Sequence, residues 1–298
     1  MKSALSFFID AVLAYHEQAF DAALQLTEQA AQAEPDSLFY QQAVMFLRET
    51  AVTKSVDVYV SPEGFEQFIR GGGNLPLYTN TSALLNQAYR QSNAKTLLDI
   101  GVGDGHALLP ALSDSMAALD LVEPSAAMLD KLAAELQKQA VAFRAFPMPW
   151  QQFRDQLAPN TAPAWDIIQM TFSAHTFLPE ERATLLGWCA THGKQLMIAE
   201  FDVPLFTDML TPEVIGYYVA KYERGLAEYP NEPKVMQGFL LPVFFGNFAH
   251  NSERVTFEQT AVHWQTNLEN AGFTAVQKVP IYDYWWAPAF MLTAKGRV

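Results

Sequence analysis

From about residue 95 onward, short apolar runs alternate with stretches of helical periodicity. The runs predicted to be strands cover residues 96–100, 118–122, 141–146, 166–171 and 195–201. The stretches between them that predict helices lie near residues 126–139, 150–157 and 180–191. Strands that alternate with helices at this spacing favour a parallel sheet with helices on both faces.

The pattern changes near the C-terminus. A predicted helix over residues 257–271 ends at Gly272, and two apolar runs follow it, 274–281 and 289–294, with a short link between them. This link is too short for the crossover that parallel neighbours need, so the two strands must pair antiparallel. The sequence therefore predicts a doubly wound α/β fold with a seven-stranded, mostly parallel sheet and an antiparallel last strand.

The N-terminal part predicts helices only. Residues 3–50 carry apolar positions at helical spacing, interrupted at Glu34-Pro35-Asp36-Ser37. The stretch from Ala19 to this turn resembles one tetratricopeptide-type hairpin. Repeat arrays need several stacked units to bury their apolar faces, so a single hairpin either packs on the main domain or recruits a partner. We expect residues 1–90 to form an N-terminal helical cap.

The main domain is expected over residues 91–298, with an insertion at 204–256. This insertion is rich in Tyr, Phe, Met and Pro and contains a predicted helix over residues 212–229. Loops of this length inside a compact domain are usually functional or hold extra helices. Tyr218 and Tyr222 are four residues apart and share one face of that helix. They serve either as part of a substrate lid that excludes water or as ordinary helix packing.

Composition and charge limit the kinds of partner that the protein is expected to bind. Of the 298 residues, 50% are hydrophobic and 17% are charged, and the formal net charge is −13. Binding to phosphate backbones and anionic lipid relies on Lys and Arg, so this excess of acidic residues argues against nucleic-acid and membrane partners. We expect a small-molecule substrate, with the N-terminal helices as the candidate surface for a protein partner or a second copy of the chain in a homodimer.

The cysteine and histidine residues indicate neither a disulfide nor a metal site. Cys189 is the single cysteine, which excludes an intramolecular disulfide, and it lies in an apolar helical stretch as either a buried inert thiol or a reactive one. The histidines are isolated rather than at metal-ligand spacing, so no metal site is expected. No stretch approaches the roughly 20 apolar residues that span a bilayer. We therefore expect a cytoplasmic protein.

A glycine-rich motif, Asp99-x-Gly101-x-Gly103-x-Gly105, ends the first predicted strand and leads into a helix. Glycine permits positive φ and lets a ligand approach the backbone closely. A dinucleotide-binding loop has the spacing Gly-x-Gly-x-x-Gly. Here the third glycine comes one position early, and His106 occupies the expected place. This spacing disfavours a nicotinamide dinucleotide.

An acidic residue, Glu123, ends the second predicted strand and is followed by Pro124 and Ser125. A carboxylate at this position can accept hydrogen bonds from both ribose hydroxyls of an adenosine moiety. Hydrogen bonds to charged groups are worth roughly 1.5–3 kcal/mol each. The glycine loop and Glu123 together indicate a site for a nucleoside-containing ligand.

These two motifs resemble those of the class I S-adenosylmethionine-dependent methyltransferase family. The resemblance runs from about residue 94 to the C-terminus and includes the reversed last strand. It implies that the glycine loop faces the methionine part of S-adenosylmethionine and that the acidic residue holds the ribose. The residues that would bind the cofactor by this resemblance are Asp99, Gly101, Gly103, Gly105, Glu123 and Pro124.

A narrower resemblance concerns residues 74–85, 253–258 and 264–273, which are similar to stretches of the GRAS family. Plant members of that family are transcriptional regulators on the same fold, and bacterial relatives are thought to methylate small molecules. This chain keeps the glycine loop that plant members lack, which favours catalysis.

Candidate catalytic residues follow the fourth and fifth predicted strands, because ligands of doubly wound folds bind beyond the carboxyl ends of the strands. His175 has an imidazole whose usual pKa of about 6.5 suits proton removal, and the alternative is a solvent-facing loop histidine. Glu200 and Asp202 are two positions apart on a strand and are expected on the same side. They either bind or activate a substrate, or one of them caps the next turn.

Three functional hypotheses remain open from the sequence. The first is methyl transfer from S-adenosylmethionine to a small-molecule acceptor, and it rests on the glycine loop and Glu123. The second is a non-catalytic sensor or adaptor that uses the same pocket for a regulatory ligand and the N-terminal hairpin for a partner. The third is a nicotinamide-dependent dehydrogenase, which the glycine spacing disfavours. Fold alone does not decide the acceptor atom.

Overall fold

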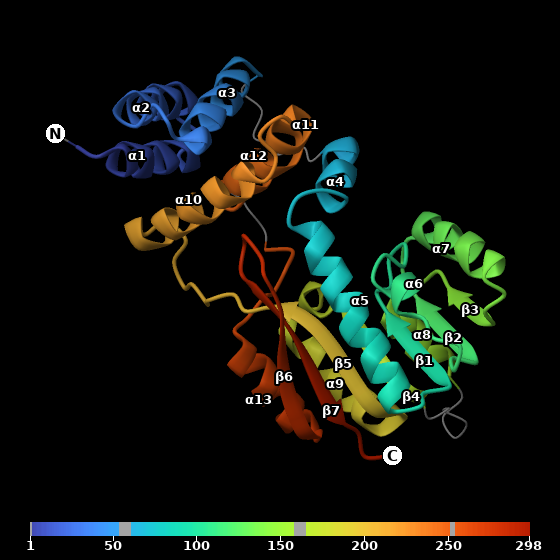
Figure 1. The fold of residues 1–298 in the computed structure, drawn as a ribbon. Helices are drawn as coiled ribbons and strands as arrows, with labels where there is room; N and C mark the ends of the chain where they lie inside the picture. The colour runs from blue at the N-terminus through green and yellow to red at the C-terminus, as the bar shows by residue number, and fades with distance from the viewer. Residues whose placement is uncertain (1, 54–60, 158–164, 251–253) are drawn as a thin grey trace. The chain divides into compact units, whose positions relative to one another are not determined.

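The chain forms two compact units in the computed structural model, which describes residues 2–53, 61–157, 165–250 and 254–298 (Figure 1). The helical unit comprises Met1–Leu75, Phe206–Arg254 and Tyr284–Trp286. The sheet unit comprises Pro76–Leu205, Val255–Asp283 and Ala287–Val298. The insertion predicted at 204–256 therefore belongs largely to the same unit as the N-terminal helices; its residues 251–253 lie outside the described ranges.

The sheet unit contains one seven-stranded sheet with the order β3-β2-β1-β4-β5-β7-β6. The strands β1 to β5 run parallel, and β7 is antiparallel to both β5 and β6. Its strands are β1 (Thr96–Ile100), β2 (Ala118–Val122), β3 (Phe143–Phe146), β4 (Trp165–Thr171), β5 (Gly193–Phe201), β6 (Thr274–Asp283) and β7 (Pro288–Lys295). This order and the reversed last strand confirm the predicted fold class, a doubly wound, Rossmann-like methyltransferase fold.

Helices cover both faces of this sheet (Figure 1). The helices of the sheet unit are α5 (Asn74–Gln91), α6 (Leu108–Ala111), α7 (Ala126–Lys138), α8 (Trp150–Gln156), η1 (Ala174–Thr176), α9 (Pro179–His192) and α13 (Ala261–Ala271). One face of the strands packs against α8, α9 and α13 in a single buried apolar cluster, to which Leu98, Ile168 and Ile198 contribute. Side chains alternate between the faces of a strand, so Gln169 points to the other face, where it contacts Tyr89 of α5.

Several predicted boundaries differ from the structure by two or more residues, and local hydrogen bonds explain two of them. Residue 141 was expected in the third strand, but Ala140 adopts a left-handed φ of 55° and the Val141 N–H donates to Leu136 O, which closes α7. The last helix was expected from residue 257, but the Thr260 side chain caps α13 by accepting from the His263 N–H, so the helix begins at Ala261.

The helical unit is built around buried aromatic rings. Its helices are α1 (Ala4–His16), α2 (Phe20–Ala33), α3 (Leu38–Thr53), α4 (Pro62–Ile69), α10 (Pro212–Ala227), α11 (Pro233–Val235), η2 (Met236–Leu240) and α12 (Leu241–Gly246). Phe8, Phe39 and Phe244 pack with ring centroids 4.9–5.8 Å apart. The core of this unit therefore joins the N-terminal helices to the insertion.

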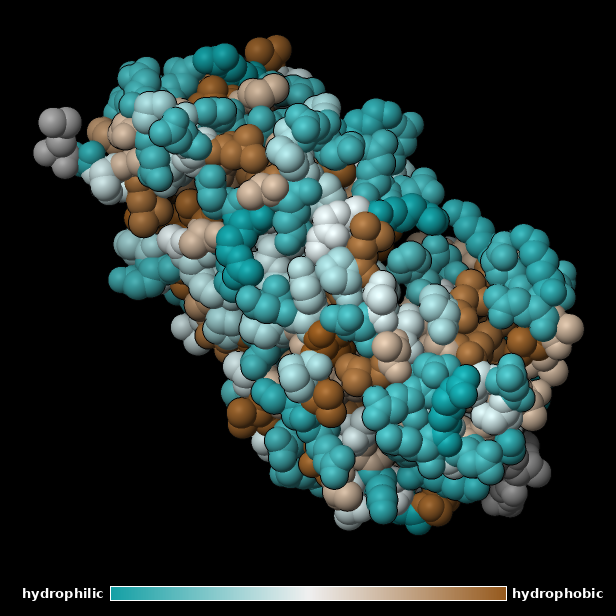
Figure 2. All heavy atoms as spheres, viewed as in Figure 1, coloured by the Kyte–Doolittle hydropathy of each residue, from teal (hydrophilic) through white to brown (hydrophobic). Residues whose placement is uncertain are grey.

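The surface shows no single apolar face on the side seen in Figure 2, where apolar residues lie in scattered groups among polar ones. None of the helices in the described ranges has the length and apolar character that crossing a bilayer requires.

A carboxylate from the insertion caps an N-terminal helix. Glu223 of α10 accepts hydrogen bonds from the Ser37 hydroxyl at 2.7 Å and from the Leu38 and Phe39 N–H groups at 3.1 Å each. These N–H groups lie in the first turn of α3, where the helix itself offers them no acceptor. The Ser37 hydroxyl caps the helix locally by accepting the Tyr40 N–H at 3.3 Å, and Glu223 completes this cap from a distant part of the sequence.

We expect Glu223→Ala to lower the free energy of unfolding by about 1.5–3 kcal/mol, because hydrogen bonds to a charged group are lost and backbone donors stay unsatisfied. Urea denaturation measures the change. Glu49→Ala, at an exposed position of α3, is the matched control and should change the free energy by less than about 0.5 kcal/mol. Equal losses in the two variants would contradict the capping role.

Candidate functional site

The glycine loop lies at the carboxyl end of β1, the strand from which the chain moves first to β2 and β3 and then back to β4 on the other side. In open α/β sheets the ligand crevice forms at this switch point. Gly101, Gly103 and Gly105 have φ values of 74°, 59° and 78°. These left-handed conformations are ones that other residues rarely adopt. The loop therefore has the backbone that its glycines predicted.

Glu123 turns its carboxylate toward this loop. Its Oε2 accepts the Gly103 N–H at 3.1 Å, and its Oε1 accepts the Ser125 N–H at 3.0 Å. An ionised carboxylate has about four acceptor positions, so both oxygens keep capacity for further donors. Ser125 in turn caps α7, which fixes the residues on the C-terminal side of Glu123. The predicted pairing of the glycine loop with Glu123 is present in the structure.

The three glycines have different surroundings. A Cβ on Gly101 would lie 2.5 Å from Ser173 Cβ, and one on Gly105 would lie 2.4 Å from Leu132 Cδ1. A Cβ on Gly103 would meet nothing closer than Met128 Sδ at 4.0 Å. Packing thus explains the absence of side chains at the first and third positions. Gly103 instead borders open space beside the Glu123 carboxylate, as a ligand-facing position requires.

Asp99 is buried, with 2% of its surface exposed, and belongs to a chain of polar side chains. Gln169 Nε2 donates to Asp99 Oδ2 at 2.6 Å, and the Tyr89 hydroxyl donates to Gln169 Oε1. Within the described residues, Asp99 Oδ1 has no hydrogen-bond partner. Burial raises the pKa of Asp99 to about 7 against the effect of the Gln169 hydrogen bond, and the nearby Glu123 adds to the rise. Asp99 is therefore part of the framework of the site and not a surface carboxylate.

Pro124, the remaining residue predicted to bind the cofactor, follows Glu123 at an exposed position.

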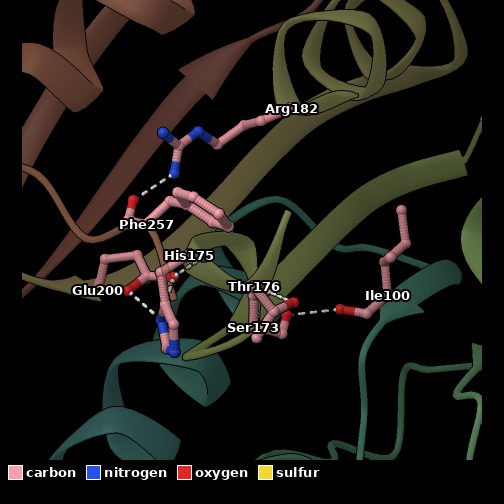
Figure 3. Close-up of polar contacts among 7 residues, drawn as sticks. All are labelled: Ile100, Ser173, His175, Thr176, Arg182, Glu200 and Phe257. Atoms are coloured by element: carbon pink, nitrogen blue, oxygen red, sulfur yellow. Dashed lines mark hydrogen bonds and ion pairs between the residues drawn. The ribbon is translucent and has the colours of Figure 1, made fainter. Parts of the chain in front are cut away.

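His175 and Glu200, which the sequence suggested separately, lie in direct contact (Figure 3). The His175 ring nitrogen Nδ1 is 2.8 Å from Glu200 Oε2 and 3.1 Å from Oε1, and the His175 backbone N–H donates to Oε1 at 2.9 Å. Glu200 is fully buried. The Phe257 N–H donates to the His175 carbonyl at 2.7 Å, which holds the segment from the other side.

This contact determines the charge state of the imidazole. Burial alone would lower the pKa of His175, but the charge and hydrogen bond of Glu200, together with the charge of Glu258, outweigh burial and raise it above the ordinary value of 6.5. With Nδ1 directed at Glu200, Nε2 is the ring nitrogen left to exchange a proton with a ligand. The pair therefore has the arrangement of an oriented general base.

The other candidate residues have structural contacts. Asp202 Oδ1 accepts the Ala261 N–H at 2.8 Å at the start of α13, which is the capping alternative raised for this carboxylate. Tyr218 and Tyr222 belong to the helical unit, where both are buried and stack at 6.4 Å. Each also packs edge-on against a phenylalanine of that unit. A lid role for the two tyrosines stays a prediction.

The sequence analysis missed a row of aromatic side chains beside the glycine loop. His106, Tyr78, Phe172 and Phe201 contact one another in this order, with ring centroids 4.5, 5.7 and 4.8 Å apart. We call these residues the aromatic row. An aromatic residue directly after β4 and another at the end of β5 were visible in the sequence, but only the fold brings Tyr78 of α5 between them and His106.

A separate cavity of about 250 Å³ lies at the opposite edge of the sheet, by the first residues of β1 and β2. Within it, Asp120 accepts two hydrogen bonds of 2.6 Å from Arg144 and one of 2.9 Å from Trp165 Nε1. Its charged groups are thus already paired, and the cavity is not part of the site at the glycine loop.

No model of a protein family matches the chain, and no curated protein matches its sequence. Solved structures similar to it are S-adenosylmethionine-dependent methyltransferases. Magnesium protoporphyrin IX methyltransferase from Synechocystis PCC 6803, with bound S-adenosylhomocysteine, is 12% identical over 75% of this chain and 84% of its own, with a TM-score of 0.48. The 1,6-didemethyltoxoflavin-N1-methyltransferase from Burkholderia thailandensis is 15% identical over 74% and 78%, with a TM-score of 0.49. Mitomycin 7-O-methyltransferase is 15% identical over 93% and 71%, with a TM-score of 0.45.

The glycine surroundings predict an order of stability losses. Gly103→Ala should cost about 1–2 kcal/mol, the cost of a left-handed conformation alone. Gly101→Ala and Gly105→Ala should cost more, because each adds a contact below 3.0 Å. Gly187→Ala in α9 is the control: its Cβ would meet nothing within 4 Å, and a stabilisation of roughly 0.5–1 kcal/mol is expected. Chemical denaturation measures all four variants, and a larger loss for Gly103→Ala than for Gly105→Ala would contradict this order.

The His175–Glu200 contact predicts a titration. Glu200→Gln should lower the pKa of His175, because the amide has no negative charge; NMR of the imidazole over a pH series measures it. Glu180→Gln, at an exposed position of α9, should leave the pKa unchanged. Since folding raises the pKa, protonated His175 stabilises the fold below about pH 6.5, and this contribution is lost as pH rises through the folded-state pKa. An unchanged pKa in Glu200→Gln would show that the contact does not form.

Proposed function

We propose that the protein binds S-adenosylmethionine and transfers its methyl group to a small-molecule acceptor. The observation that carries this proposal is the Glu123 carboxylate turned onto the Gly103 N–H at the carboxyl edge of β1 and β2. Its support comes from the chain's own geometry: an acidic residue with free acceptor capacity faces a left-handed glycine that has open space beside it.

The residues present fit this cofactor. Glu123 would hold the ribose hydroxyls with the acceptor positions that the two backbone N–H groups leave free. Gly103 would let the amino-acid part approach the backbone, because no side chain fills that space. Pro124, at the exposed side of Glu123, would border the nucleoside.

When bound, the cofactor would supply a methyl group on a sulfonium sulfur, open to in-line attack by the acceptor atom, with S-adenosylhomocysteine as the leaving group. Holding the two reactants in this geometry can account for about 7–11 kcal/mol of the barrier. For a hydroxyl or protonated nitrogen acceptor, His175 Nε2 would take the proton that the acceptor loses. Glu200 would stabilise the imidazolium through Nδ1.

The finer assignment to a GRAS-like branch is part of the same proposal. Residues 74–85 form the first two thirds of α5, and residues 254–258 lead toward α13; residue 253 lies outside the described part of the chain. Tyr78 of the aromatic row comes from the first of these segments. A small-molecule acceptor is the substrate class that bacterial members of that branch suggest.

Calorimetry with S-adenosylhomocysteine tests the proposal. Glu123→Ala should weaken binding by about 10- to 200-fold, the loss expected from one or two charge-assisted hydrogen bonds. Glu135→Ala, at a half-exposed position of the neighbouring helix α7, is the control and should bind like the parent protein. A melting curve of each variant confirms that it is folded.

Two outcomes would refute this function. One is the absence of binding to the parent protein at millimolar ligand, and the other is equal binding by folded Glu123→Ala. Binding without methyl transfer to any acceptor in a broad panel would instead favour the non-catalytic sensor.

A further inference from the structure

The aromatic row connects the glycine loop to the end of β5. His106 follows Gly105 directly, Tyr78 comes from α5, Phe172 follows the last residue of β4, and Phe201 is the last residue of β5. The rings contact one another in sequence, edge-on from His106 to Tyr78 and from Tyr78 to Phe172, and stacked at 21° from Phe172 to Phe201. All four residues are partly exposed. An apolar core would bury such rings, so this row is a surface of the sheet unit.

Phe172 and Phe201 lie on the side of β1 opposite to Glu123. In the sheet order, β2 is on one side of β1 and β4 and β5 are on the other. Neighbouring strands are about 4.8 Å apart, which places the end of β4 roughly 10 Å from the end of β2. A cofactor whose sugar is held at Glu123 and whose amino-acid part follows the glycine loop would thus present its methyl group toward β4. An acceptor bound beside Phe172 would therefore be in position to receive the methyl group.

Phe172 is held in an unfavourable backbone conformation. Its φ is 53°, a region where bulky residues are outliers. The surrounding contacts keep it there: the Phe172 N–H donates to Ala199 O at 2.9 Å, and the neighbouring Ser173 hydroxyl donates to Ile100 O at 2.7 Å. Glycine would adopt this conformation without strain. A strained non-glycine residue at the edge of a site points to a function for its side chain.

The end of the row formed by Phe172 and Phe201 has no ionisable group that a charged acceptor would pair with. Burial, aided by the Asp104 charge, raises the pKa of Tyr78 to about 12, so its hydroxyl stays protonated. Phe172 and Phe201 offer only apolar ring surface. Flat aromatic ligands stack on such surfaces with their ring faces, and saturated ligands of the same size have no π-face to stack with.

We propose that the acceptor is a flat, uncharged aromatic or heteroaromatic molecule that packs against Phe172 and Phe201, with Phe172 as the specificity-determining residue. This inference rests on the proposed function, since it names the substrate class of that site. The Tyr78 and His106 end of the row meets the cofactor loop, and the Phe172 and Phe201 end receives the acceptor.

The test compares two probes with the same carbon skeleton and the same hydroxyl position: 1-naphthol, which is flat and aromatic, and decahydro-1-naphthol, which is saturated and puckered. Their binding is measured by saturation-transfer NMR titration on the full chain, with and without saturating S-adenosylhomocysteine. We expect 1-naphthol to bind at least about tenfold more tightly than the saturated probe, in the range that stacking on an aromatic side chain supplies.

Phe172→Gly removes the ring and relieves the strained backbone. It should weaken 1-naphthol binding about tenfold or more, leave S-adenosylhomocysteine binding within about twofold, and not lower the unfolding midpoint. Phe65→Leu is the matched control, because Phe65 is a partly exposed phenylalanine of the helical unit that pairs with another phenylalanine ring. It should leave the binding of both probes unchanged.

Three results would overturn the inference: no saturable binding of 1-naphthol at millimolar concentration, equal binding of the two probes, or unchanged 1-naphthol binding in Phe172→Gly. These are distinct from failure of the proposed function, which shows as absent S-adenosylhomocysteine binding. Binding of 1-naphthol that excludes S-adenosylhomocysteine would also overturn it, because an acceptor and the cofactor must be bound together.

Discussion

The hydrogen bond between the Gly103 N–H and the Glu123 carboxylate links the ends of two neighbouring parallel strands. It depends on the register of β1 and β2, in which Ile100 is paired with Val122, so that the glycine loop and Glu123 leave the sheet at the same level. It also depends on the left-handed backbone at Gly103, which turns the N–H toward the acidic residue. A shift of the register by one residue would separate the two groups and leave the site without its acidic partner.

The fold was largely predictable because its determinants are local. Apolar runs and helical periodicity placed the strands and most helices of the sheet unit, and the short link before residue 289 required the antiparallel pair. Two predicted ends were wrong where a hydrogen bond overrode the pattern, at Val141 and Thr260. The association of residues 206–254 with the N-terminal helices was beyond the sequence pattern, because it is set by contacts between aromatic rings far apart in the chain.

The sequence predicted which residues belong to the site better than it predicted their contacts in space. The glycine spacing and Glu123 identified the loop and its partner. Nothing in the sequence pattern favours Glu200 over Asp202, since both lie at the end of the same strand, two positions apart. The structure distinguishes them through their neighbours: Glu200 contacts His175, while Asp202 accepts the Ala261 N–H at the start of α13. Phe172 escaped notice because its left-handed conformation cannot be read from its residue type.

The helical unit is assembled from three separate segments, and the last of them, Tyr284–Trp286, lies in the link between β6 and β7. Trp285 packs so closely on α10 that a Cβ on Gly225 would lie 2.8 Å from its ring. During synthesis, the core of the helical unit therefore stays incomplete until Trp286 has left the ribosome. Domains whose contacts span such long sequence separations fold slowly and expose apolar surface meanwhile. The chain thus depends on its final hairpin to finish a unit that begins at its first helix.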